Sequence, residues 1–167
     1  MTAPGAIRAF DVGDVERLQE ILERFADHAR LRCVALVERN GQLLTAVGSD
    51  LLNDTAAFAS LTAADFAASD RLAELLGEDE FTSLFHQGDL GSMFAVAIGN
   101  HAILACLFDQ RTTLGLVRVH ARTTVPQLAE LVAEIATRQP MNGAQSAALG
   151  SAWADEAESE IDRLFGF

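Results

Sequence analysis

Apolar positions recur every third or fourth residue between residues 11 and 29, which is the spacing of an amphipathic helix. The side chains that form its apolar face are Val15, Leu18, Ile21, Leu22, Phe25 and Ala29. The residues turned away from that face are acidic, namely Glu16, Glu20, Glu23 and Asp27. Either Asp11 or Asp14 is expected to cap the N-terminus of this first helix.

Apolar runs with the length of strands follow this helix. Residues 33–37 are apolar at every position, which predicts a strand inside the sheet that is covered on both faces. Asn40 and Gly41 predict a tight hairpin turn with positive φ angles, and residues 42–47 predict the return strand. Three further strands are expected at residues 81–87, 93–98 and 102–108, the first of them a short edge strand.

Two more helices are predicted. Residues 54–76 are rich in alanine, and Gly77 is typical of a helix C-cap. The apolar spacing between residues 114 and 135 predicts the last helix, in which Pro126 should introduce a kink or a break. Thr124 and Gln127 are then expected to form a capping box for its second half. The order of elements predicts an α+β sandwich with a mostly antiparallel five-stranded sheet and helices on both faces.

The chain divides into four segments by composition. We expect a flexible N-terminus at residues 1–10, one domain at 11–138, a linker at 139–150 and a short acidic amphipathic helix at 151–167. This last segment is too short to be a stable helix alone, so it must dock on its own domain or on a partner. The N-terminus shows no signal peptide, and the longest apolar runs, of about seven residues, cannot span a bilayer, which takes ~20 residues. The prediction is a cytoplasmic protein with no membrane insertion.

Charge and composition exclude several classes of function. The 167 residues include 24 acidic and 12 basic ones, so the net charge is -12. Such a surface repels a phosphate backbone, which argues against nucleic-acid binding. All the basic residues are arginine, and the absence of lysine excludes the P-loop, protein-kinase and Schiff-base chemistries that depend on it.

The residues that carry chemistry are scattered. The four histidines, His28, His86, His101 and His120, fall in separate elements, and no two have metal-ligand spacing. Ser92 lacks the flanking glycines of a nucleophile elbow. Cys33 and Cys106 are expected to be reduced and buried, with a disulfide between neighbouring strands as the alternative. We therefore expect no enzyme, no cofactor and no metal, although a small hydrolase built on His86 stays a minor alternative.

With no catalytic or metal site expected, the surface of the protein is the remaining candidate for its function. The alanine-rich helix offers a shallow face that another backbone can approach closely, with Phe58, Leu61 and Phe66 as candidate contacts across a subunit boundary. Alternatively, its alanines reflect helix propensity alone, and the small face packs on the protein's own sheet. The edge strand at 81–87 carries neither lysine nor proline, and a free edge of this kind favours pairing with a second copy.

Four short motifs occur in a specific order and spacing. They are Leu-Leu-Gly-Glu at 75–78, Phe-His-Gln-Gly at 85–88, Leu-Phe-Asp at 107–109 and Leu-Gly at 114–115. In this order and spacing the sequence resembles the roadblock/dynein light chain family, and within it the bacterial MglB group. The resemblance covers residues 11–138. It implies a profilin-like sandwich and a homodimer, in which the edge strands of two copies join and the second helices pair on one face.

The resemblance also implies a partner. Proteins of this group bind a Ras-like small GTPase of the MglA type on the helical face, and they stimulate hydrolysis by repositioning the GTPase's own catalytic residues, in cell polarity or motility. By position, the GTPase-binding residues here would be Ala63, Ala64, Ala67, Ala68, Arg71, Trp153, Ile161 and Leu164. The dimer interface would include Phe66, Phe81, Ser83, Phe85, His86 and Gln87. A polar location within the cytoplasm would follow.

Three residues depart from the family pattern. Arg71 stands where the family tends to have a small residue, Phe66 is bulky on the same helix, and Pro126 interrupts a helix that is usually continuous. The alternative function is therefore a non-catalytic roadblock adaptor that serves a different GTPase or complex.

Overall fold

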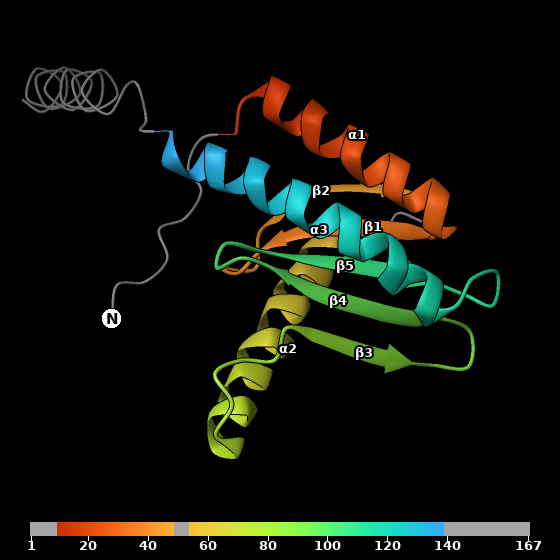
Figure 1. The fold of residues 1–167 in the computed structure, drawn as a ribbon, viewed down its shortest axis with the longest axis vertical. Coiled ribbons are helices and arrows are strands. Elements are labelled where there is room, and N and C mark those ends of the chain that lie inside the picture. Colours follow the sequence, from red (N-terminus) through yellow and green to blue (C-terminus); the bar gives the residue numbers. More distant parts are fainter. Residues whose placement is uncertain (1–9, 49–53, 139–167) are drawn as a thin grey trace, which may run out of the picture. The chain divides into compact units, whose positions relative to one another are not determined.

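The computed structural model describes residues 10–48 and 54–138. It contains an α-helix, a β-hairpin, a second helix, three strands and a third helix (Figure 1). Their bounds are α1 Val12–Ala29, β1 Cys33–Glu38, β2 Leu43–Gly48, α2 Thr55–Leu76, β3 Ser83–Gln87, β4 Ser92–Ile98, β5 Ala102–Phe108 and α3 Leu114–Thr137. The linker and the C-terminal helix predicted at 139–150 and 151–167 lie outside the described residues.

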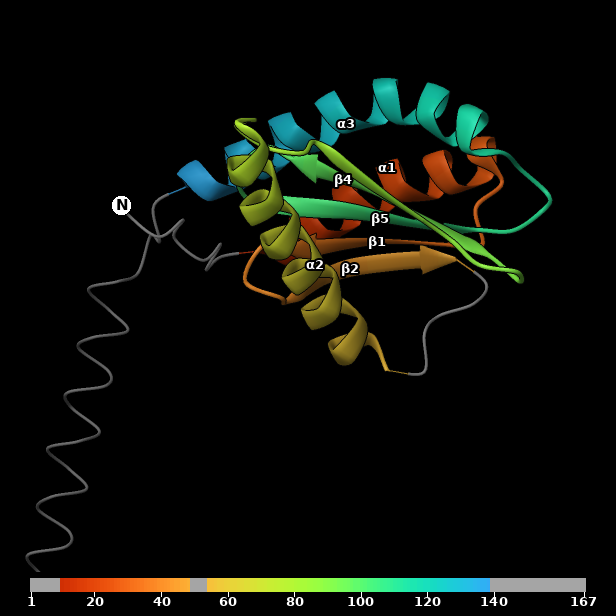
Figure 2. The same ribbon diagram turned by 90° about the horizontal axis from the view of Figure 1, so that it is seen from below.

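The five strands form one antiparallel sheet in the order β2-β1-β5-β4-β3. Helices α1 and α3 cover one face, and α2 crosses the other (Figure 2). All six residues of β1 are buried, as predicted for a strand covered on both faces. The α+β sandwich with helices on both faces is confirmed.

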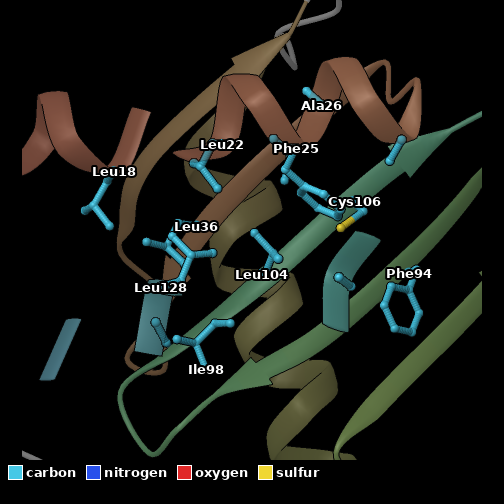
Figure 3. Close-up of a cluster of buried hydrophobic side chains, with 14 of the residues drawn as sticks. Leu18, Leu22, Phe25, Ala26, Leu36, Phe94, Ile98, Leu104, Cys106 and Leu128 are labelled. Atoms are coloured by element: carbon cyan, nitrogen blue, oxygen red, sulfur yellow. The ribbon is translucent and has the colours of Figure 1, made fainter. Parts of the chain in front are cut away.

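The larger core lies between the sheet and the pair α1–α3. Leu18, Leu22 and Phe25 of α1 meet Leu36 of β1 and Leu104 of β5, and all five are at most 2% exposed (Figure 3). Asp11 fixes the start of α1 through a capping box: its carboxylate accepts from Asp14 N at 2.8 Å, and Asp14 accepts in return from Asp11 N at 3.3 Å. The apolar periodicity of α1 therefore faces the sheet, and of the two predicted caps Asp11 is the one used.

The layer under α2 is built from small residues. The strand register aligns Ala46, Ala35, Ala105 and Ala95 in a row across four strands. The buried face of α2 is equally small, with Ala59, Thr62, Ala63, Ser69 and Ala73, and Phe66 is its one large, fully buried side chain. Alanine against alanine allows helix and sheet to approach closely, and Phe66 fills the remaining space against Ile103 and its neighbours.

The predicted geometry of the β1–β2 turn is wrong. In the β1–β2 turn only Gly41 has a positive φ, of 92°, and Gly41 N donates to Glu38 O at 2.9 Å. Asn40 instead uses its side-chain oxygen to accept from Gln42 N at 3.0 Å. The connection is thus a three-residue loop with glycine in its last position, and not a two-residue turn with two positive φ angles.

Helix α3 continues through Pro126 and arches over the sheet without a break (Figure 2). The predicted capping box is absent. Thr124 Oγ1 donates to His120 O at 3.0 Å, and Gln127 Nε2 donates to Thr123 O at 2.9 Å. Leu128, Leu131, Val132 and Ile135 beyond the proline are all buried in the larger core, so packing holds the second half of α3 in line.

The two cysteines are free and buried, as predicted. Cys106 pairs with Val34 in the sheet register, so its side chain shares the face of Val34 and joins the core under α1 and α3. Cys33, the neighbour of Val34, points to the opposite face because side chains alternate along a strand. This placement excludes a disulfide between them. Burial raises the pKa of the Cys106 thiol far above its usual range, which keeps it protonated and inert.

Candidate partner-binding surfaces

Strand β3 is the open edge of the sheet. Among the described residues it pairs with β4 alone, whereas α1 packs along the opposite edge strand, β2, where Gln19 Nε2 donates to Thr45 Oγ1 at 3.2 Å. Phe85, His86 and Gln87 are exposed. The strand begins at Ser83 and not at the predicted Phe81, and no lysine or proline protects it. An unprotected edge of this kind is a template for pairing with another strand.

The solvent face of α2 carries a row of small and apolar side chains, called here the α2 stripe. It consists of Ala57, Leu61, Ala64, Ala67, Ala68, Arg71, Leu72 and Leu75. Its three leucines are strongly exposed: Leu61 at 70%, Leu72 at 55% and Leu75 at 82%. An exposed apolar row this long, on a helix whose other face is already packed, is typical of a protein-binding surface.

The α2 stripe and the open edge lie next to each other. The C-terminal turns of α2 reach past β3 in Figure 1, so part of the helix projects beyond the sheet. On the same face of the sheet as α2, the cross-strand row His86, Met93, Leu107 and Cys33 lines a hollow of about 510 Å³. A second protein that pairs with β3 would therefore also meet the projecting end of α2.

Two polar contacts fix α2 against the sheet. Arg39, which follows β1, donates from Nη1 to Asp70 at 2.9 Å, and its guanidinium lies 5.8 Å from the centre of the Phe66 ring. Near the open edge, His86 Nε2 lies 2.6 Å from a carboxylate oxygen of Asp65. Each contact joins α2 to a strand region, one on either side of Phe66 along the helix.

The predicted site residues are distributed unevenly. Ala64, Ala67, Ala68 and Arg71 are exposed on the α2 stripe, and Arg71 is engaged with Glu74 of the same helix. Ala63 faces the sheet and is 8% exposed. Of the predicted interface residues, Ser83, Phe85, His86 and Gln87 lie on β3, and Phe81 lies just before it.

Phe66 was predicted at the dimer interface, but its side chain is buried in the core of one copy. Its side chain is 1% exposed and packs against the alanine row and Ile103, and the half-buried Phe58 packs in the same layer. Trp153, Ile161 and Leu164 lie outside the described residues. The sequence reasoning missed Leu72 and Leu75 as surface residues, although plotting α2 at 100° per residue places them with Ala64 and Ala68.

The described part of the chain holds no group of three or more potential metal ligands. His28 and His120 stack with ring centres 5.8 Å apart between α1 and α3, His86 contacts Asp65, and His101 lies in the β4–β5 turn. Among the described helices, none is long and apolar enough to cross a membrane.

The sandwich, its open edge and the crossing helix together define a roadblock domain, and the chain belongs to the Roadblock/LC7 family, whose domain model matches residues 17–108. It is similar to Myxococcus xanthus MglB, with 36% identity over 71% of this chain and 96% of that chain, at a TM-score of 0.67.

It is also similar to a structure described as MglB with tetrameric arrangement, at 28% identity over 80% of this chain and 99% of that chain, with a TM-score of 0.73. The gliding protein MglB from Thermus thermophilus is 29% identical over the same shares of the two chains, at a TM-score of 0.72.

Other comparisons bear on the fold alone. Profilin Ib from Acanthamoeba castellanii shares the fold at 13% identity and a TM-score of 0.52, covering 68% of this chain and 97% of profilin. No curated protein matches the chain by sequence. The family predicted from the four short motifs is confirmed.

Proposed function

We propose that this protein is a homodimeric regulator of a Ras-like small GTPase of the MglA type, and that it accelerates GTP hydrolysis in a cell polarity or motility system. The observation that carries the proposal is the exposed α2 stripe beside an open sheet edge, in a chain 36% identical to Myxococcus xanthus MglB. The MglB structure described as tetrameric supports self-association as a property of such proteins.

The proposed dimer joins the β3 strands of two copies. This pairing would satisfy the outward N–H and C=O groups of both edges and extend the sheet across the two-fold axis. The projecting ends of both α2 helices would then meet, and Leu72, Leu75 and Leu76 would lose most of the exposure they have in one copy. Burial of apolar surface would thus add to the backbone hydrogen bonds, which alone contribute little net stability.

The proposed GTPase site is the part of the α2 stripe built from Ala64, Ala67 and Ala68. Alanine side chains let the backbone of a partner approach closely, so binding there can fix the position of a loop of the GTPase. A regulator of this kind supplies no catalytic group of its own. It acts by binding the active arrangement of the GTPase more tightly than the inactive one, which shifts the population toward the active arrangement.

The decisive experiment is single-turnover GTP hydrolysis by the MglA-type GTPase of the same organism, with and without this protein. We expect a large acceleration, because catalysis of phosphoryl transfer rests almost entirely on the positioning of groups and on electrostatic stabilisation. Binding should also be stronger to the GTPase loaded with a non-hydrolysable GTP analogue than to the GDP form. Equal hydrolysis rates with bound protein present would contradict the proposal.

One observation favours a second candidate, a non-catalytic roadblock adaptor. Arg71 places a large, 78% exposed side chain on the α2 stripe, where it pairs with Glu74. A GTPase that fits a flat row of alanines would have to accommodate this ion pair. Binding of equal strength to the GDP and GTP forms, without acceleration, would establish the adaptor.

A further inference from the structure

The face of the sheet opposite α2 carries a separate hollow. It lies between α3 and strands β3 and β4 and has a volume of about 470 Å³. Its apolar lining comes from Phe94, Val96, Ala121, Val125 and Pro126. Val96 and Val125 are only half-buried, so apolar surface remains open to solvent there. Because α2 covers the other face, this hollow lies on the opposite side of the sheet from the proposed GTPase site, although Thr82 and Ser83 at the β3 edge also line it.

Two arginines of α3 border the hollow. Arg118 and Arg122 are exposed, and neither has an ion-pair partner within residues 10–48 and 54–138. The guanidinium of Arg118 lies 5.6 Å from the centre of the Phe94 ring, so it is held over the apolar lining by a cation–π contact. Within the same described ranges, no acidic residue lines the hollow.

This local charge is opposite to that of the whole chain. The protein has 24 acidic residues and 12 basic ones, yet the charged residues that line the hollow in the described structure are two arginines. The two arginines are four residues apart on one helix, so their Cβ atoms are about 6 Å apart. Carboxylates spaced by one turn of a second helix would match that separation.

We propose that this hollow binds an acidic amphipathic helix of a partner protein. Apolar side chains of the partner would enter the hollow over Val96 and Val125, and its carboxylates would pair with Arg118 and Arg122. From Arg118 to Pro126 the hollow follows α3 over nine residues, a rise of about 12 Å, which is slightly more than two helical turns. The site is an interaction surface in addition to the α2 stripe, and it does not depend on the identity of the GTPase.

The test uses the full chain and three synthetic fluorescent peptides of 14 residues. The first has leucine at every third or fourth position and glutamate at most of the others. The second carries lysine in place of glutamate, and the third carries alanine in place of leucine. We expect the first peptide to bind, at least tenfold more tightly than either of the others, and to be weakened as NaCl rises from 50 to 300 mM. Amide chemical-shift changes should centre on Val96, Ala121 and Val125.

Charge-reversal variants distinguish binding at this hollow from binding at the α2 stripe. The double variant Arg118→Glu and Arg122→Glu should weaken binding of the first peptide at least tenfold, and thermal unfolding should show that it remains folded. Arg71→Glu on α2 is the matched control, because it reverses an exposed arginine on the other side of the sheet, and it should leave peptide binding unchanged. Three results would overturn the proposal: no binding of the acidic peptide, equal binding of the lysine or alanine peptide, or equal binding by the double variant.

Discussion

His86 on the edge strand and Asp65 on α2 lie with ring nitrogen and carboxylate oxygen 2.6 Å apart, although 21 residues separate them along the chain. The contact joins the two surfaces proposed to bind partners. Both side chains are substantially exposed, 53% for His86 and 37% for Asp65, so the pair contributes under about 1 kcal/mol in one copy. It is one of the two polar contacts that join α2 to a strand region of the sheet.

Charge at the centre of the α2 stripe should prevent GTPase binding. Ala67→Arg and Ala68→Arg each place a long cation where the proposed interface is dry and close, and burying an unpaired charge is costly. We expect binding to weaken at least 100-fold, measured by titration with the GTPase loaded with a GTP analogue, and the dimer to stay intact in sedimentation. Ala136→Arg, an exposed alanine on α3, is the control and should bind normally. Unchanged binding by both α2 variants would exclude this face.

If the β3 strands of two copies pair, charged substitutions on β3 should determine whether the dimer forms. In an antiparallel pair of β3 strands with its two-fold axis at Phe85, Ser83 of one copy lies opposite Gln87 of the other. Ser83→Lys with Gln87→Lys then places like charges directly opposite one another, which destabilises the pair. We expect this double variant to sediment as a monomer at concentrations where the unmodified protein is a dimer.

The matched control reverses one of these charges. Ser83→Glu with Gln87→Lys places opposite charges across the same two positions and should preserve the dimer. If both double variants dissociate equally, or neither does, then β3 pairing in this register is wrong.

Phe66 should behave as a core residue. It is 1% exposed, and its removal would leave a cavity between α2 and the alanine row. Phe66→Ala should therefore lower the free energy of unfolding by about 3 to 5 kcal/mol, measured by urea denaturation. Phe66→Leu, which keeps most of the volume, should lower it much less. Selective dissociation of the dimer at unchanged stability would instead place Phe66 at the subunit interface.

Asp109 should make stability depend on pH in the acid range. The Arg111 side chain and backbone N–H donate hydrogen bonds to its carboxylate, at 2.9 and 3.0 Å, and these bonds lower the pKa of that carboxyl. A lowered pKa in the folded state adds stability that is present above the unfolded pKa of about 4 and lost as the pH falls through the folded value.

Asp109→Asn should thus be less stable than the unmodified protein at pH 7, and the difference should shrink below pH 4. Urea denaturation at several pH values measures this difference. Asp89→Asn, which neutralises an exposed carboxylate in the β3–β4 turn, is the matched control for the loss of one negative charge. A difference independent of pH would contradict the role of Asp109.

Local patterns were sufficient to predict the strands and helices, but not which side chains meet. The apolar run at Cys33–Val37 indicated a strand covered on both faces, because no other placement buries every side chain. The row of alanines from Ala46 to Ala95 could not be predicted from the sequence, because it forms only when four strands are aligned in register. Without that row, nothing indicated that the buried face of α2 has room for Phe66.

Pro126 is a single residue whose effect likewise could not be predicted from the local sequence. Proline lacks the N–H of a helix interior and disfavours the helix by ~3 kcal/mol, so the sequence predicted a kink or a break near Thr124. Burial of Leu128, Leu131, Val132 and Ile135 outweighs that cost. The proposed partner surfaces were predictable in part. Motifs located α2 and β3, and plotting α2 at 100° per residue from the predicted Ala64 and Ala68 would have added Leu72 and Leu75.

The alanine row has a consequence for motion. A buried alanine removes much less apolar surface from water than a leucine, so the turns of α2 that bury only small residues are held more weakly than the leucine-rich turns of α1 and α3. Such elements open locally at a lower free-energy cost than the rest of the domain. Backbone amides of α2 should then exchange with solvent before those of α1, and a protein that binds α2 would slow this exchange. The helix that carries the proposed binding surface would thus also be the element whose order a partner changes most.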